Sequence, residues 1–310
     1  RLADGTRIVG AIRGRDAIYI WTDTALFIMR FVGPPFTFSF QQVGTNCGLI
    51  GQKAAVEVDG SAYWMSENGF FRYTGKLESL PCLVEDYVYD DLATVPRQHI
   101  YAGLNNLFGE VTWFYPGSGA ASNNRSVTYN YMDSTGERPV WTTSSLARST
   151  WADSSIFGKP HATGYYSSAT DDSTVGNTDG TTTYYEHETG TNQIKAGATT
   201  GISASIESGD FDLDQKGLAG DGEFMLKIRR VIPDFLTQTG DARVTLNLKN
   251  YPTDSQASSS LGPFTTTTST TKIDTRARAR AISLKVDNTS TTQHWKLGTF
   301  RLDIQPDGRR

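Results

Sequence analysis

The sequence predicts an all-β chain, with a β-propeller that is incomplete at the N-terminus followed by an antiparallel β-sandwich-like domain. The main observation is a hairpin-like unit with an aromatic centre that recurs four times before residue 195. Its tryptophans, Trp21, Trp64, Trp113 and Trp151, are 43, 49 and 38 residues apart. Repeats of about 40–50 residues made of short strands are typical of propeller blades, each of which needs its neighbours to cover its faces.

The composition fits this class and argues against several others. Hydrophobic residues make up 37% of the chain and aromatic residues 11%, with abundant glycine in the turns. No window of about 11 residues keeps the apolar spacing of an amphipathic helix, and no run of about 18 apolar residues predicts a membrane span. The net charge of −4 argues against a protein that binds nucleic acid through broad attraction to phosphates.

Residues 1–198 are predicted to form the propeller blades. Asn68-Gly69 lies between two aromatic strands and predicts a type I′ hairpin turn, because both residues tolerate a positive φ. Gly33-Pro34-Pro35 is expected to stop strand pairing, since proline has no N–H to donate. Residues 83–92 are the best candidate for a short helix. About four blades are recognisable, whereas propellers have four to eight, so we expect earlier blades in the native protein.

Residues 199–310 are predicted to form the second, β-sandwich-like domain. The aromatic hairpins stop near residue 200, and strands with alternating polar and apolar residues take over. We expect this domain either to pack on the propeller or to complete it. Its predicted strands are Ile202–Ile206, Phe224–Ile232, Arg243–Leu248, Ile282–Val286 and Thr299–Ile304.

The polar segments predict loops rather than metal sites. Residues 116–126 and 167–183 are rich in small polar residues and predict long surface loops. The acidic run Asp210–Asp214, with Asp221 in the twelfth place, is the nearest approach to a calcium loop. An EF-hand needs glycine at the sixth position, where this chain has Gln215, and flanking helices. We therefore expect a solvated turn.

The cysteines and histidines predict no reaction centre. Cys47 and Cys82 lack a CxxC spacing, so we expect two buried free thiols, although a bridge between them stays open because the sequence gives no Cα distance. His187 lies between two glutamates, but strand neighbours point to opposite faces, so these residues would not act together. We predict no enzyme, no catalytic residue, no cofactor and no metal.

One strand has a pattern that suggests an interaction. Arg276, Arg278 and Arg280 alternate with alanines, so in a strand the three guanidinium groups share one face, which would continue through Ile282, Leu284 and Val286. They are candidates for a subunit interface, where they pair with carboxylates, or for a DNA channel, where they contact phosphates. A solvent-exposed strand that carries charge against edge pairing is the third interpretation.

Several segments together resemble the tail nozzle, or tail hub, proteins of short-tailed bacteriophages. The resemblance covers most of the chain. Its segments are Gly60–Ser66, Gly69–Tyr73, Leu80–Cys82, Asp86–Val88, Glu207–Phe211, Arg229–Asp234, Thr275–Arg278 and Trp295–Asp303.

The resemblance implies a structural virion protein of the viral tail, assembled in the host bacterial cytoplasm. Such proteins form a hexameric ring below the portal and its adaptor, extend the channel for double-stranded DNA, and help to retain and then release the genome. They also offer a platform for tail fibre, spike or tip proteins, and they carry no known active site. Residues 167–183 would form a constriction or a contact with a neighbour, or stay an exposed loop. Arg278→Glu is expected to impair ring assembly or genome retention.

An alternative is a propeller that binds or cleaves glycans. A carbohydrate-binding propeller needs exposed aromatic side chains, and Trp21, Trp64 or Trp113 could serve. Tryptophans between apolar strand neighbours are usually buried, so we expect these three in the core.

Overall fold

The structure, a computed structural model, describes residues 4–93, 97–153, 157–165, 182–195, 198–213, 224–251, 254 and 259–308. Within these ranges nearly all regular structure is β-strand, which confirms the all-β prediction. The chain divides into two compact units, Arg1–Thr189 and Gly190–Arg310, whereas the sequence placed the boundary between 198 and 199. The described helices are too short and too polar to cross a bilayer.

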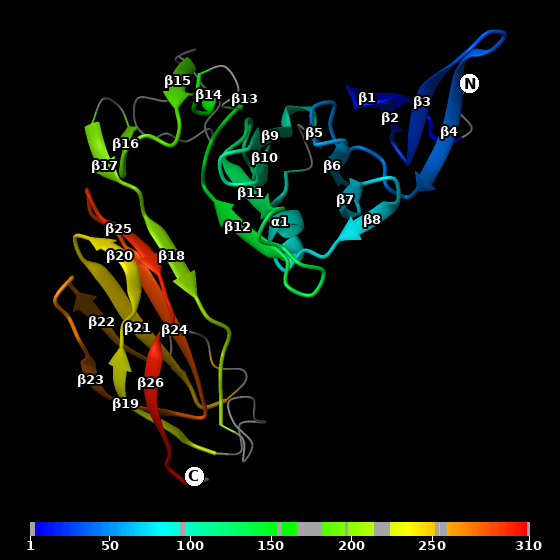
Figure 1. The fold of residues 1–310 in the computed structure, drawn as a ribbon. Coiled ribbons are helices and arrows are strands. Elements are labelled where there is room, and N and C mark those ends of the chain that lie inside the picture. The colour runs from blue at the N-terminus through cyan, green and yellow to red at the C-terminus, as the bar shows by residue number, and fades with distance from the viewer. Residues whose placement is uncertain are drawn as a thin grey trace. The chain divides into compact units, whose positions relative to one another are not determined.

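The first unit consists of small open antiparallel sheets that follow one another along the chain (Figure 1). Each of the first three sheets is a four-stranded meander in which every strand pairs with the next, and the fourth sheet has three strands. The strands are β1 (Ile8–Arg13), β2 (Ile18–Thr22), β3 (Ala25–Gly33), β4 (Thr37–Thr45), β5 (Ala55–Val58), β6 (Ser61–Ser66), β7 (Gly69–Tyr73), β8 (Leu77–Leu80), β9 (Tyr101–Asn105), β10 (Glu110–Tyr115), β11 (Arg125–Asn130), β12 (Val140–Ser144), β13 (Thr150–Ala152), β14 (His161–Tyr165) and β15 (Thr182–Glu186).

The first strands of successive sheets lie next to one another. β1 contacts β5, β5 contacts β9, and β9 contacts β13. Lys53, just before β5, forms a parallel bridge with Tyr101 in β9, and the Ala102 N–H donates to the Lys53 carbonyl at 2.8 Å. The sheets are therefore joined to their neighbours at the same strand each time.

The tryptophans fill the space between the sheets. Trp21, Trp64 and Trp113 are fully buried, which confirms that they belong to the core. Trp64 Nε1 donates to the Cys47 carbonyl at 2.8 Å, in the segment that links the first sheet to the second. Trp113 Nε1 donates across to the Ala54 carbonyl at 3.0 Å. Trp21 Nε1 is buried without a partner among the described residues.

The fourth repeat differs from the other three. Trp151 lies on the first strand of its sheet, β13, instead of the second, and it is only half-buried. Its indole still donates to a preceding sheet, from Nε1 to the Leu104 carbonyl at 2.8 Å. Because Trp113 lies on the second strand of its sheet and Trp151 on the first, the spacing between them is the shortest of the three, at 38 residues.

Two local predictions are confirmed. The pairing of β3 stops at Gly33-Pro34-Pro35, because its last pair with β4 is Gly33 with Thr37 and neither proline belongs to the ladder. The two prolines lie in the connecting turn, where the ladder requires no N–H. The short helix within residues 83–92 is confirmed as α1 (Glu85–Asp91), and a 3-10 helix, η1 (Arg97–His99), follows it.

The cysteines are free, as predicted. Cys47 is buried and Cys82 half-buried. Burial raises the pKa of each thiol to about 11, because the apolar surroundings disfavour the thiolate. Both thiols are therefore protonated and poorly nucleophilic at neutral pH.

The second unit contains a four-stranded sheet, order β18-β24-β21-β22, a three-stranded sheet, order β23-β19-β26, and the two-stranded pairs β16-β17 and β20-β25. All five strands predicted by alternation are present, which confirms these five predictions. The bounds are β16 (Asn192–Lys195), β17 (Ala198–Gly201), β18 (Ala204–Glu207), β19 (Leu226–Ile232), β20 (Phe235–Thr239), β21 (Ala242–Lys249), β22 (Ser260–Thr266), β23 (Ile273–Ala279), β24 (Ala281–Asn288), β25 (His294–Leu297) and β26 (Arg301–Pro306).

One hydrophobic core joins the two larger sheets of this unit. Val244 and Leu246 of β21 and Val286 of β24 pack in the same cluster as Leu226 and Ile228 of β19. Alternate residues of a strand point to opposite faces, so the other side of each sheet carries the polar residues. The outer face of sheet β23-β19-β26 is therefore polar.

We predict that Gly103→Ala destabilises the first unit by about 1–3 kcal/mol through overpacking. A Cβ at this position in β9 would lie 2.6 Å from Trp151 Cγ, so the indole would have to move. Urea unfolding followed by tryptophan fluorescence measures the change.

The control for this substitution is Gly136→Ala, since nothing lies within 4 Å of a Cβ at that position. It should change the free energy of unfolding by less than about 0.5 kcal/mol. Equal midpoints for the two variants would contradict the tight contact between β9 and Trp151.

A second prediction concerns acid stability. Burial, and then the charge of Arg148, lower the pKa of His187 to about 4, and Arg148 Nε donates to His187 Nε2 at 3.0 Å. The unfolded chain therefore takes up this proton first as the pH falls from about 6.5 to 4, so stability that is present above pH 6.5 is lost in that window. The loss attributable to His187 should reach about 3 kcal/mol.

His187→Gln should remove that part of the pH dependence in urea titrations at several pH values. His294→Gln is the matched control, because His294 is exposed. Parallel pH profiles for wild type and His187→Gln would refute the assignment.

Candidate functional site

The predicted arginine strand is β23, at the edge of sheet β23-β19-β26. Arg276 and Arg278 are exposed, while Ala277 between them and Ala279 after them are buried in the core. The two guanidinium groups therefore share the outer face, as the alternation predicts. Arg280 follows the strand, is half-buried, and donates its backbone N–H to the Lys249 carbonyl at 3.0 Å.

The prediction that this face continues through Ile282, Leu284 and Val286 is wrong. These three side chains lie in β24, which belongs to the other sheet, and they are buried in the shared core. The chain bends at Arg280 as it passes from one sheet to the other, and the alternation shifts by one residue. In β23 the buried residues Ala277 and Ala279 have odd numbers, whereas in β24 the buried residues Ile282, Leu284 and Val286 have even numbers.

Strand pairing brings further charges beside the arginines. β19 pairs with β23 on one side and with β26 on the other, so the exposed side chains of all three strands share one surface. We call this surface the basic face. Six basic side chains lie on it against three acidic ones, although the whole chain has a net charge of −4. The basic residues are Lys227, Arg229, Arg230, Arg276, Arg278 and Arg301, and the acidic ones are Asp274, Asp303 and Asp307.

Two of the acidic residues are already paired. Arg230 Nε lies 2.8 Å from Asp274 Oδ1, and Lys272 Nζ lies 3.0 Å from Asp274 Oδ2. The hydrogen bonds from Arg230 and Lys272 lower the pKa of Asp274. The hydrogen bond to Asp274 raises the pKa of Arg230. Arg278 Nε lies 2.5 Å from Asp307 Oδ2. Little negative charge is left to balance the other basic residues.

The remaining cations are poorly compensated. Lys227 lies directly opposite Arg278 across the strands, an arrangement of like charges that destabilises a sheet. Arg276 forms no hydrogen bond or ion pair with any residue that the structure describes. If only the edge strand β23 were charged, the charge would be explained as protection against pairing with another chain. Lys227 and Arg229 lie on the central strand β19, where such protection is not needed. The excess therefore favours binding of an anionic partner.

Sequence reasoning missed the β19 contribution. The alternation of Lys227, Ile228 and Arg229 predicted a strand. That this strand lies beside β23 depends on pairing between residues about 50 positions apart in the sequence. A single sequence carries no signal for that pairing. The site is therefore larger than the three arginines that predicted it.

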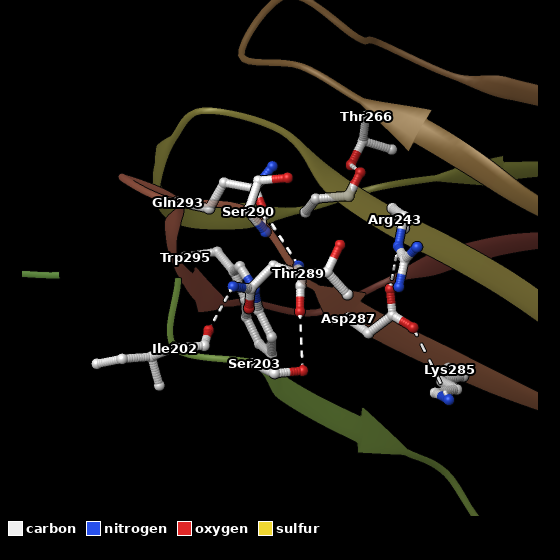
Figure 2. A network of polar contacts seen from close by, with 12 residues as sticks. Ile202, Ser203, Arg243, Thr266, Lys285, Asp287, Thr289, Ser290, Gln293 and Trp295 are labelled. Atoms are coloured by element: carbon white, nitrogen blue, oxygen red, sulfur yellow. Dashed lines mark hydrogen bonds and ion pairs between the residues drawn. The ribbon is translucent and has the colours of Figure 1, made fainter. Parts of the chain in front are cut away.

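A second polar cluster in this unit is structural (Figure 2). Asn288, which is 3% exposed, donates from Nδ2 to the Ile202 carbonyl at 2.8 Å and accepts from Trp295 Nε1 at 2.9 Å. Arg243 Nε lies 2.5 Å from Asp287 Oδ1. These buried and half-buried polar groups have their partners within the chain, so the cluster fixes β24 and β25 beside the segment before β18.

The structure adds little support for the other sites that the sequence suggested. Among the residues that the structure places, no three metal-ligating side chains gather. Asp210, in the acidic run, pairs with Lys249 at 2.6 Å, while 214–223 lie outside the described residues. Most of the 167–183 loop also lies outside them. His187 is held by Arg148, which accounts for its burial without a carboxylate.

Comparison with protein families and with curated proteins gives no relative. The chain matches no protein-family model, and no curated protein matches it. Function therefore has to be argued from the sheets, the basic face and the exposed surfaces.

We predict that Arg276→Glu weakens binding of the chain to a fluorescent DNA duplex at low salt, if the basic face contacts phosphates. Loss of one phosphate contact should lower the slope of log K against log salt by about one. Fluorescence anisotropy over a salt series gives both quantities.

Arg138→Glu is the control, because it changes the net charge equally from an exposed position in the first unit. If the two variants bind the duplex alike, the basic face does not contact phosphates, and a protein surface is the better partner.

Proposed function

We propose that this chain is part of a tail nozzle ring of a short-tailed bacteriophage, a structural virion protein and not an enzyme. Six copies would surround the DNA channel below the portal-bound adaptor, help to retain and then release the genome, and carry fibre, spike or tip proteins. The observation that carries the proposal is the repeated meander with adjacent first strands. Its combination with the sequence resemblance gives a specific assembly to test.

The meanders support a propeller as the fold of the first unit. Blades of a propeller are small antiparallel sheets whose strands pair in chain order, with their first strands around a common axis. The contacts of β1 with β5, of β5 with β9 and of β9 with β13 follow that rule. For the second unit, two sheets on one core support a sandwich.

The basic face supports an anionic partner for the second unit. In a ring, carboxylates of the neighbouring subunit are the first candidate, because arginine forks fit planar carboxylates and the chain as a whole is acidic. Phosphates of DNA in the channel are the second candidate, with contacts that do not read sequence. Arg276, Arg278 and their neighbours on β19 would carry either contact.

The glycan alternative loses its main support. Trp21, Trp64 and Trp113 are 0% exposed, so none of them can stack on a sugar from the surface. The alternative would have to use other aromatic residues.

We predict that the purified protein forms a particle of six times the 34.0 kDa chain mass, alone or when mixed with its adaptor complex. Native mass spectrometry gives the stoichiometry, and negative-stain microscopy shows whether the particle is a ring. Capture of six copies only on the adaptor also supports the proposal, since assembly can depend on a template.

A monomer that ignores the adaptor at every concentration would refute the ring. Binding and cleavage assays on bacterial glycans would then test the alternative.

A further inference from the structure

A cavity of about 420 Å³ lies in the first unit, where the first strands of the second, third and fourth sheets come together. Its lining residues come from the starts of β9, β13 and β15, from β14, and from the segments that precede β5, β9 and β11. We call it the first-strand pocket. Its volume falls in the range of about 300–1,000 Å³ that is usual for small-molecule sites.

The first-strand pocket has a buried floor and an exposed rim. Ile100 and Asn123 are 0% and 4% exposed, whereas Lys53 and His99 are exposed. Asn123 Nδ2 donates to the His99 carbonyl at 2.7 Å and to the Arg148 carbonyl at 2.9 Å. These two bonds tie the segment before β11 to the segments before β9 and β13. The floor is therefore held by the chain itself, as in a site that is formed before its ligand arrives.

Lysine supplies the charge of this pocket. Lys53 forms no ion pair with any residue that the structure describes, and its Nζ lies 5.6 Å from the centroid of the Tyr101 ring. The ring attracts the ammonium group and keeps it at the pocket wall. No acidic side chain occurs among the described residues that line the pocket, although acidic residues outnumber basic ones in the chain by 33 to 29. The pocket therefore favours an anion.

His99 adds a hydrogen-bonding group to the rim. Its Nδ1 lies 3.2 Å from the Ala121 carbonyl. A carbonyl only accepts, so Nδ1 carries a proton in this contact and the neutral ring has its lone pair on Nε2. Nε2 has no partner among the described residues, so it is free to accept a hydrogen bond from a ligand hydroxyl.

Three hydroxyl groups form another part of the wall. Thr150 and Thr163 lie opposite each other on β13 and β14, with their Oγ1 atoms 2.7 Å apart. Ser149 Oγ lies 3.1 Å from Thr163 Oγ1. Each hydroxyl donates one hydrogen bond and accepts two, so the cluster keeps acceptor positions that no described residue fills.

These groups together fit a sugar that carries an acid group. A lysine ammonium binds a carboxylate or a phosphate through charge-assisted hydrogen bonds. The hydroxyl cluster and the His99 ring match the hydroxyl groups of a sugar. An apolar ligand would leave the polar groups of the wall without partners, which costs binding free energy. A small inorganic anion would use Lys53 and leave the hydroxyl cluster unused.

A larger hollow in the first unit lacks this selectivity. Its volume is about 590 Å³, and it lies beside the β1–β2 turn and β5. Its charged lining residues are two arginines and two acids, Arg13, Arg15, Glu57 and Asp59. Because the opposite charges balance, this hollow favours neither an anion nor a cation.

We propose that the first-strand pocket binds a small sugar with a carboxylate or phosphate group, with Lys53 on the acid group and His99, Thr150 and Thr163 on the hydroxyls. The pocket lies within one chain, so a monomer and a ring can both carry it. This inference therefore stands or falls separately from the proposed assembly.

Saturation-transfer NMR of the purified protein with glucuronate and with glucose 6-phosphate tests the ligand class. At least one of the two should bind saturably, and the better of them shows whether the pocket prefers a carboxylate or a phosphate. Glucose lacks the acid group and acetate lacks the hydroxyls. Each should bind about tenfold more weakly than the better acidic sugar.

Substitutions at the rim then locate the site. Lys53→Met should raise the dissociation constant of the acidic sugar about tenfold, whereas Lys53→Arg, which keeps the charge, should stay within about threefold of the wild type. Thr150→Val removes one hydroxyl and should weaken the sugar about threefold or more. Lys76→Met is the matched control, because it removes the same charge from an exposed position of the first unit that does not line the pocket.

Four outcomes would overturn the inference. If neither acidic sugar binds, the pocket is not a site for this class. Equal binding of glucose would show that the acid group is not recognised, and equal binding of acetate that the sugar is not. If Lys53→Met and Lys76→Met bind the acidic sugar alike, binding occurs elsewhere on the chain. Equal urea midpoints for these two variants show that any difference between them is not due to unfolding, and the comparison of ligands uses the wild type alone.

Discussion

The packing of the first unit depends on a hydrogen bond between a buried indole and the main chain of a preceding segment. A buried N–H without a partner costs about 1–3 kcal/mol, and three of the four repeat tryptophans avoid this cost with an acceptor where the sheets meet, whereas Trp21 Nε1 has none among the described residues. Trp64 uses the Cys47 carbonyl, Trp113 the Ala54 carbonyl and Trp151 the Leu104 carbonyl. The bond places each sheet at a defined position against its neighbour, and the large rings fill the gap between them.

Local sequence patterns predicted much of this fold. The aromatic strands around Asn68-Gly69 predicted a hairpin, and alternating polar and apolar residues predicted the strands of the second unit. Both patterns succeed because they depend only on residues that are close in the chain. The error at Arg280 has a long-range cause. The alternation through Arg280 looked like one strand, but Ile282 and the residues after it lie in the other sheet, where they are buried in the shared core.

The candidate site shows the same limit. Three arginines were visible in the sequence, but Lys227 joins them only through the pairing of β19 with β23. The exposed hairpin between β3 and β4 was not predicted, although Phe31, Phe36, Phe38 and Phe40 and the long uncharged stretch were visible. Aromatic strands are usually buried, so the sequence alone favours a core position for these side chains. They are exposed because β2 begins only at Ile18, opposite Met29, and covers no part of β3 beyond it.

The order of strand pairing has a consequence for how the chain folds. In the first unit each strand pairs with the next one made, so loop closure costs little and each sheet can form soon after its strands are available. In the second unit β18 pairs with β24, and β19 pairs with β26, the last strand. The core of that unit therefore forms late, and the apolar faces of β19 and β21 stay open to wrong partners until β26 arrives.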